Sequence, residues 1–486
     1  MGNPILAFPD PEDDVQMAMR ESPVGHERAV ACLKGLGVFR LLISLASGQG
    51  RLMLRGTKRT STLSRVAAQI CPAVAAICCG AVSSGCANRG DLPLRTLPAS
   101  TLVVADRVDH LDVVAREPMV VEHQDGTLFV SGYGQPRPRL WKSQDHGKTW
   151  TRVNVGSEAD GAVGDSDVDL AIAPDGTLFF VNMGFDRKAR EGTHIAIGVS
   201  RDLGATWRWT LLSKNRFDDR PWVKVAADGT AHVIWNDGNG IRYVVSRDGG
   251  VTWIQRPRIY PQGGSSHLAV GPNKEVAVRV TPLSASGFKF NEGVDLIAIS
   301  VDGGATWQNH PAPGQRHWAT SYTDPSYREN MRWVEPLAWD SGGALYSFWT
   351  NQKDLWLARS VDRGETWTNW HVAASDEMSY FPYLVARGRG ELAATWFSGR
   401  GETLHAHVAR FDVRNGATPP KIIESPPIRP ESWRSSARPE DPPIREPGGE
   451  YMAVTFLRAG GLAVVSDIQN AREQHFGFSW SRLEER

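Results

Sequence analysis

The stretch Ser143-Gln-Asp-His-Gly-Lys-Thr-Trp150 is the first of five copies of one octapeptide in this chain. Every copy reads Ser-x-Asp-x-Gly-x-Thr-Trp, and successive copies begin 57, 46, 54 and 60 residues apart. The later copies begin at Ser200, Ser246, Ser300 and Ser360. A repeat at this spacing is typical of architectures in which one supersecondary unit must stack on the next to bury its faces. We therefore expect a repeat protein.

The octapeptide contains the residues that a tight turn needs. Its Ser and Asp oxygens can accept backbone N–H groups, its Gly can adopt a positive φ, and its Trp can pack behind the turn. We predict a structural role for these residues. The octapeptide resembles the Asp-box, or BNR repeat, of sialidase-like β-propellers, in which it caps the outer hairpin between the third and fourth strands of a blade.

The same order of strands and turns recurs around each copy. Apolar runs alternate with Gly turns, which predicts antiparallel hairpins. Five units carry the octapeptide, a sixth (383–411) has a degenerate copy at 412–418, and a seventh (451–483) has none. The predicted fold is all-β, a β-propeller of four-stranded antiparallel blades. The count gives seven blades, with six, the number in sialidases, as the alternative.

Two further segments bear on the propeller. A strand near Thr101–Val104 is expected to complete the last blade, because a closed ring has no exposed sheet edge. A Pro-rich insertion at about 418–449 is too irregular for a blade and is expected to form a surface loop or lid. The propeller itself is expected to span 114–486, after a linker and ring-closing strand at 87–113.

The composition narrows the classes of partner. Lys plus Arg equals Asp plus Glu, at 54 each, so no net charge favours nucleic acid. All five cysteines precede residue 87, whereas all 18 Trp lie at Trp141 or later. The repeat region therefore has no thiol for a disulfide, a zinc site or a nucleophile. We expect a monomer without a cofactor.

Residues 53–86 have the pattern of an export signal. A basic stretch is followed by an apolar run at 66–82 and by small residues before Cys86. Ser-Ser-Gly-Cys86 resembles a bacterial lipobox, which implies a lipidated Cys86 and an exported protein anchored in the cell envelope. A cleaved signal, giving a periplasmic or secreted protein, and a membrane anchor are the alternatives. Because export signals begin near their basic region, we predict that Met53 is the true start and that 1–52 are a mis-called extension.

Polar or charged residues precede the first strand of all seven units. The first strand of each propeller blade lines the central funnel, so we expect these residues to meet there and to bind an anionic or hydroxyl-rich ligand such as a glycan. The alternative is that they mark solvent-exposed strand starts. The segments are 116–118, 165–169, 218–222, 265–267, 332–335, 380–383 and 450–451.

The sialidase resemblance implies a particular chemistry. Sialidases bind the sugar carboxylate with an Arg cluster and use a Tyr nucleophile polarised by a Glu, with an Asp as acid/base catalyst. Arg116-Glu117-Pro118 is similar to the family's aromatic-Arg-Ile-Pro opening, which makes Arg116 the first clamp residue. The further clamp candidates are Arg220, Arg332 and Arg279. The resemblance implies that Tyr383 or Tyr380 is the nucleophile and that Glu335 polarises it. It implies Asp219 or Asp167 as the proton donor.

Several single residues allow two interpretations. Asp165, Asp167 and Asp169 could bind Ca²⁺ through oxygen ligands or form a turn. His267 could be a general acid/base or a hydrogen-bonded funnel residue, and Trp222 and Trp333 could stack on a sugar or pack between blades. Glu450 and Tyr451 complete the expected substrate-binding set.

We expect a glycoside hydrolase of the exo-sialidase type. The alternatives are a non-catalytic propeller that binds a glycan or a protein, and a membrane-tethered scaffold.

Overall fold

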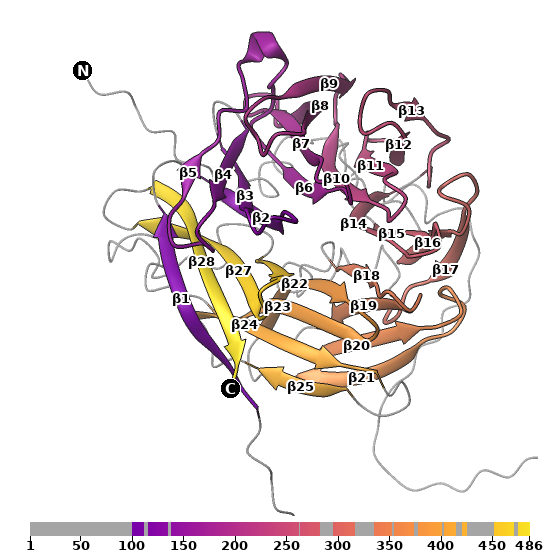
Figure 1. Ribbon diagram of the computed structural model, residues 1–486. Helices are drawn as coiled ribbons and strands as arrows, with labels where there is room; N and C mark the ends of the chain where they lie inside the picture. The colour runs from indigo at the N-terminus through magenta and orange to yellow at the C-terminus, as the bar shows by residue number, and fades with distance from the viewer. Residues whose placement is uncertain are drawn as a thin grey trace, which may run out of the picture. The chain divides into compact units, whose positions relative to one another are not determined.

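The computed structural model describes residues 100–110, 115–134, 138–261, 263–281, 295–315, 335–351, 354–373, 378–400, 403–414, 420–424, 452–470 and 475–486. Apart from a 3-10 turn, η1 (Glu158–Asp160), all regular structure in these residues is β. The strands form seven four-stranded antiparallel sheets. Figure 1 shows these sheets as blades around one axis, with the first strands nearest the middle. The predicted seven-bladed β-propeller is confirmed, and the alternative of six blades is wrong.

The first four blades follow the chain from the centre outward. Blade 1 contains β2 (Arg116–Glu122), β3 (Leu128–Tyr133), β4 (Arg139–Ser143) and β5 (Thr151–Arg152). Blade 2 contains β6 (Val168–Ile172), β7 (Leu178–Asp186), β8 (Glu191–Ser200) and β9 (Arg208–Ser213). Blade 3 contains β10 (Asp219–Val225), β11 (Ala231–Asn236), β12 (Ile241–Ser246) and β13 (Ile254–Gln255). Blade 4 contains β14 (Gly264–Val270), β15 (Val276–Thr281), β16 (Leu296–Ser300) and β17 (Gln308–Pro311).

The last three blades close the ring. Blade 5 contains β18 (Leu337–Trp339), β19 (Leu345–Thr350), β20 (Leu355–Ser360) and β21 (Thr368–Ala373). Blade 6 contains β22 (Met378–Arg387), β23 (Glu391–Arg400), β24 (Thr403–Asp412) and β25 (Lys421–Glu424). Blade 7 contains β26 (Ala453–Phe456), β27 (Leu462–Asn470), β28 (His475–Glu485) and, outermost, β1 (Leu102–His110). The strand expected near Thr101–Val104 is thus β1.

One boundary differs from the sequence-based expectation. The Pro-rich insertion was expected to begin at about residue 418, but Lys421–Glu424 form β25, the fourth strand of blade 6. Its backbone pairs with β24, with Lys421 opposite Asp412. Residues 425–451 lie outside the described residues, as do 1–99 with Cys86. Within the described ranges, no helix is long and apolar enough to cross a membrane.

The octapeptide forms the turn between the third and fourth strands of blades 1 to 5. In blade 1, the Asp145 carboxylate accepts hydrogen bonds from the Ser143 hydroxyl (2.8 Å), the Thr149 backbone N–H (2.9 Å) and the Thr149 hydroxyl (2.6 Å). The Trp150 indole N–H donates to the Gly147 carbonyl at 3.0 Å. Hydrogen bonds from the Thr149 side chain and backbone lower the pKa of Asp145 to about 2. The predicted turn function of the octapeptide residues is confirmed.

The fifth residue of each octapeptide touches the preceding blade. These glycines have φ between +79° and +88°, a region that L side chains rarely adopt. A Cβ added to any of them would also crowd a side chain of the blade before. The pairs are Gly147 with Trp480, Gly204 with Val153, Gly250 with Val199, Gly304 with Tyr243 and Gly364 with Ile299. The octapeptides therefore set how closely neighbouring blades pack.

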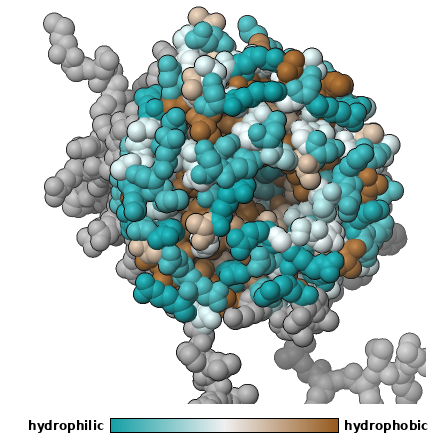
Figure 2. All heavy atoms as spheres, in the orientation of Figure 1, coloured by the Kyte–Doolittle hydropathy of each residue, from teal (hydrophilic) through white to brown (hydrophobic). Residues whose placement is uncertain are grey.

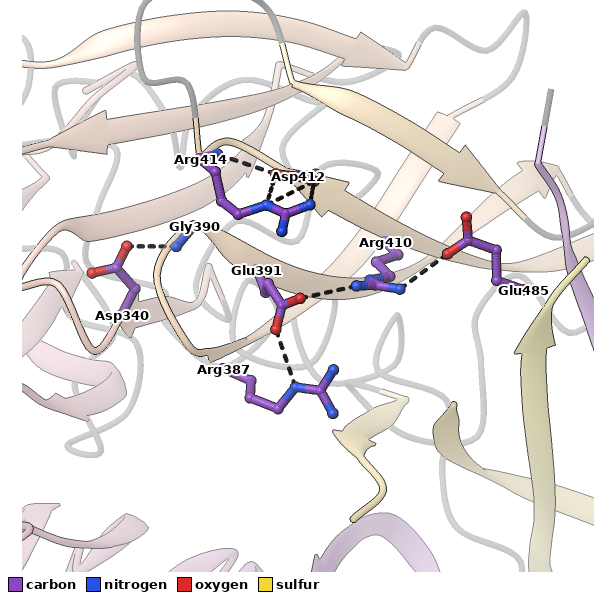
Figure 3. Close-up of polar contacts among 8 residues, drawn as sticks. All are labelled: Asp340, Arg387, Gly390, Glu391, Arg410, Asp412, Arg414 and Glu485. Atoms are coloured by element: carbon purple, nitrogen blue, oxygen red, sulfur yellow. Dashed lines mark hydrogen bonds and ion pairs between the residues drawn. The ribbon is translucent and has the colours of Figure 1, made fainter. Parts of the chain in front are cut away.

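Blades 6 and 7, which lack the octapeptide, are joined by charged side chains. Arg410 on β24 donates to Glu391 on β23 and to Glu485 on β28, both at 3.0 Å. The Arg387 guanidinium donates to Glu391 at 3.2 Å and lies 4.4 Å from the centre of the Phe456 ring of blade 7. Figure 3 shows Arg410 between the two carboxylates. This network links the C-terminal strand, β28, to blade 6.

Replacing Gly304 by Ala should destabilise the propeller strongly. The new Cβ would overlap the Tyr243 ring at a positive φ, so we expect the free energy of unfolding to fall by more than about 2 kcal/mol. Gly303→Ala is the matched control. Gly303 has a φ of +72°, but a Cβ added there would meet nothing within 4 Å. We therefore expect the free energy of unfolding to fall by about 1 kcal/mol. Chemical denaturation checks both values, and equal losses would contradict the proposed blade contact.

Candidate functional site

Side chains from four blades meet at the axis. Met119, Trp222, His267 and Tyr383 occupy the same place in their blades: each is the first paired residue after the register shift between the first and second strands. The Trp222 and His267 ring centres are 5.1 Å apart, and those of His267 and Tyr383 are 5.7 Å apart. The Tyr383 hydroxyl donates to the Met119 sulfur at 3.6 Å. The predicted convergence of distant segments is therefore present for Trp222, His267 and Tyr383.

All four residues of this axial group are buried. Burial lowers the pKa of His267 well below its ordinary value, so the ring is neutral. Burial, with a smaller effect from the charge of Asp169, raises the pKa of Tyr383. These residues resemble a packed floor of the funnel more than a solvated binding surface.

The first strands of three blades each contain one residue with a positive φ. Glu117, Arg220 and Phe381 each precede a proline and have φ of 48°, 49° and 48°. Each lies in a β-bulge, where the register shifts just before the axial residue. A residue before proline usually has an extended backbone, so this conformation is strained. Such strain is characteristic of positions that aim side chains at a site.

The best candidate site lies at the first of these bulges. Arg116 and Glu117 open β2, Tyr133 ends β3, and Asp167 precedes β6; we call these four residues the Arg116 cluster. Burial, and to a smaller degree the charges of Glu117 and Asp167, raise the pKa of Tyr133. Arg116 acts in the opposite direction through its positive charge and its hydrogen bond to Tyr133. A phenol, a guanidinium and two carboxylates thus act on one another here. Glu117 is only 7% exposed, while Arg116, Tyr133 and Asp167 are partly exposed.

A fifth ionisable group borders the Arg116 cluster from the other side. Asp467 on β27 of blade 7 is 2% exposed, and β27 packs against β2. Burial raises the pKa of Asp467 to about 7, and the positive charge of Arg116 opposes that rise. Sequence reasoning missed both Tyr133 and Asp467, because it considered only the residues that enter first strands. A search of second-strand ends for Tyr and Asp would have found them.

Glu335, predicted to polarise the nucleophile, has a buried cation as its partner. Its carboxylate accepts a 2.5 Å hydrogen bond from Arg279 on β15, and Arg279 also lies 3.3 Å from Asp295. Arg279 and Glu335 are both 0% exposed. A buried ion pair that joins blades 4 and 5 is typical of a structural role. The catalytic role of Glu335 and the clamp role of Arg279 stay predictions.

Two of the three alternating aspartates, Asp165 and Asp169, bind different partners, and the third, Asp167, belongs to the Arg116 cluster. Asp165 accepts from the Phe185 backbone N–H (3.0 Å) and from Arg187 (2.6 Å). Asp169 accepts from the Val223 backbone N–H (2.9 Å) and from Lys224 (2.8 Å), both in blade 3. Among the described residues, no group of three His, Cys, Asp or Glu side chains could hold a metal ion.

The other predicted residues are placed only in part. Asp219 begins β10 opposite Asn236, and Arg220 is buried, with 8% of its surface exposed. Tyr380 lies in β22 opposite Phe397, where only its backbone is described. Arg332, Trp333, Glu450 and Tyr451 lie outside the described residues. Their predicted roles remain predictions.

Hydrophilic residues cover much of the face of the propeller drawn in Figure 2, and apolar residues show between them.

Comparison with known proteins identifies no family. No family model and no curated protein sequence matches the chain. Similar solved structures include a Dyadobacter fermentans protein of unknown function, 14% identical, which covers 80% of this chain and 100% of its own at a TM-score of 0.45. An α-L-arabinanase from Penicillium chrysogenum, complexed with arabinobiose, is 16% identical over 80% of this chain and 99% of its own (TM-score 0.42). A Hadza microbial sialidase is 14% identical over 64% of this chain and 65% of its own (TM-score 0.36).

Glu335→Ala should destabilise the protein severely. It would leave Arg279 buried with one carboxylate partner fewer, and breaking a buried pair costs about 3–5 kcal/mol. The control is Arg216→Ala, which breaks the 2.6 Å pair with Glu191 at a site where Arg216 is 73% exposed. We expect no measurable change there, because exposed pairs contribute little. Equal midpoints of urea unfolding for Glu335→Ala and the parent would contradict a structural role.

Proposed function

We propose that this protein hydrolyses glycosidic bonds of an acidic saccharide at the Arg116 cluster. One observation carries the proposal: a guanidinium, a phenol and two carboxylates gather where β2, β3 and the start of blade 2 adjoin. Arg binds a carboxylate through two parallel N–H donors, which suits an acidic sugar. A neutral phenol can attack beside that negative sugar without the repulsion that a carboxylate nucleophile would meet.

Each residue of the Arg116 cluster then has one task. Arg116 binds the sugar carboxylate, and the Tyr133 oxygen attacks the anomeric carbon as the glycosidic C–O bond breaks. Because the raised pKa keeps Tyr133 protonated at neutral pH, Glu117 accepts its proton during attack. Asp167, in its protonated form, protonates the leaving oxygen and then deprotonates the water that releases the sugar, while Glu117 returns its proton to the departing Tyr133 oxygen. The products are the free acidic sugar and the shortened glycan.

The alternative function is binding without cleavage. The same guanidinium and hydroxyl groups would hold an acidic glycan, but no bond would break. Tyr383, the nucleophile implied by the sialidase resemblance, remains a rival for the catalytic role, although its hydroxyl donates to the Met119 sulfur in a buried setting.

Fluorogenic sialosides and uronides provide the test. We expect Tyr133→Phe to lower kcat on the order of 10³-fold or more, because it removes the attacking oxygen. Arg116→Ala should raise KM about 10- to 100-fold through loss of a charged hydrogen bond. Tyr383→Phe is the control and should keep kcat within about twofold. If Tyr383→Phe is inactive and Tyr133→Phe is active, the site is wrong. If the parent binds sialic acid in calorimetry but cleaves nothing, the binding alternative holds.

We also propose that the chain is exported to the cell envelope and lipidated at Cys86, because 53–86 combine a basic stretch, an apolar run and small residues before that cysteine. Export with lipidation should yield a mature protein that begins at Cys86 and partitions with membranes. Cys86→Ala should release it from them. Mass spectrometry of the mature N-terminus checks this, and an unmodified N-terminus at any other residue would contradict it.

A further inference from the structure

The seam between blades 7 and 1 brings a buried acid to the proposed ligand clamp. Asp467 lies directly opposite Phe478 on β28, and side chains of directly paired residues lie on the same face of a sheet. The Phe478 ring packs 5.1 Å from Trp141 and 5.3 Å from Trp150, both in blade 1. Asp467 therefore faces blade 1 as well, where the adjoining strand is β2 with Arg116 at its start.

We propose that Asp467 is a positioning residue that competes with the acidic ligand for Arg116, so that the proton on Asp467 sets the affinity of the clamp. The proposal rests on the function proposed above for Arg116. When Asp467 is ionised, it neutralises Arg116 and repels a ligand carboxylate. When Asp467 is protonated, this opposition disappears, and Arg116 attracts the ligand carboxylate more strongly.

The charged surroundings of Asp467 favour this assignment. The titratable groups that share the corner are Arg116 and Glu117 on β2, Tyr133 on β3 and Asp167 before β6. His110 on β1 packs against Phe478, and the centres of these two rings are 5.0 Å apart. Of these groups, Arg116 is the one whose charge acts on Asp467 to favour the ionised form. Burial acts in the opposite direction and is the stronger effect, so the proton comes off near neutral pH.

The direction of the pH effect follows from this balance. Asp467 has a folded-state pKa of about 7, above its ordinary value of 3.8. The folded protein thus holds a proton that the unfolded chain loses between these values, and stability falls as pH rises toward 7. Ligand affinity should fall over the same upper range, since ionised Asp467 occupies Arg116. The sugar carboxylate itself stays ionised above pH 5.

The first experiment measures binding of free sialic acid and of glucuronate by calorimetry from pH 5.5 to pH 8.5. We expect the parent to lose at least about fivefold in affinity across this range. Asp467→Asn, which is isosteric and cannot ionise, should bind as tightly at pH 8.5 as at pH 5.5. Asp106→Asn is the matched control, because Asp106 pairs with Arg482 on the outer strands and should leave the pH profile unchanged. An unchanged pH profile in Asp467→Asn would overturn the proposal.

A second measurement needs no ligand and so separates this proposal from the function it rests on. Carbon-13 NMR of labelled aspartate should assign Asp467 a pKa near 7, and Arg116→Ala should raise that pKa because the opposing positive charge is gone. Asp467→Asn should melt higher than the parent at pH 8.5 but not at pH 5. If the pKa of Asp467 does not move in Arg116→Ala, the coupling is absent and the proposal fails. If it moves but neither sugar binds, the proposed ligand is wrong while the electrostatic coupling of Asp467 to Arg116 stands.

Discussion

The propeller depends on a backbone contact with no room for a Cβ. At the fifth residue of each octapeptide, a glycine at positive φ lies against a side chain of the blade before. The Asp and Ser side chains hold the turn in that shape, and the Trp closes it from behind. Five blades use this contact against the blade before them, so it helps to set the spacing of the ring. Trp222 of blade 3 and His267 of blade 4, two of the blades with the octapeptide, meet at the axis with Tyr383 of blade 6.

Above the buried axial residues, the chain departs from its regular geometry. Glu117, Arg220 and Phe381 take a left-handed backbone before proline, and the strand registers shift around them. A regular strand would alternate its side chains between the two neighbouring blades. The bulge gives Arg116 and Glu117 a different direction from the one that alternation would impose. The Arg116 cluster, which carries the proposed chemistry, is located at this irregularity and at the seam where the ring closes.

The sequence predicted the scaffold well because the octapeptide acts locally. Its hydrogen bonds join residues at most four apart, so the pattern determines the turn in every copy. The strand β25 was missed because Thr418-Pro-Pro precedes it, and proline usually argues against a strand. The site was harder to predict, because its partners are far apart in sequence. Nothing near Glu335 in the chain indicates that Arg279, 56 residues away, pairs with it. Tyr133 and Asp467 lie on second strands, where the alignment of strand entrances could not reach them.

The direct test of this account is to trap the glycosyl-enzyme intermediate. A fluorinated acidic sugar with a good leaving group should slow the second step and leave the sugar bound to the nucleophile. Peptide mass spectrometry of the labelled protein would then locate it. The account predicts the added mass on the Tyr133 side chain and no label in Arg116→Ala. A label on Tyr380 or Tyr383 would contradict it.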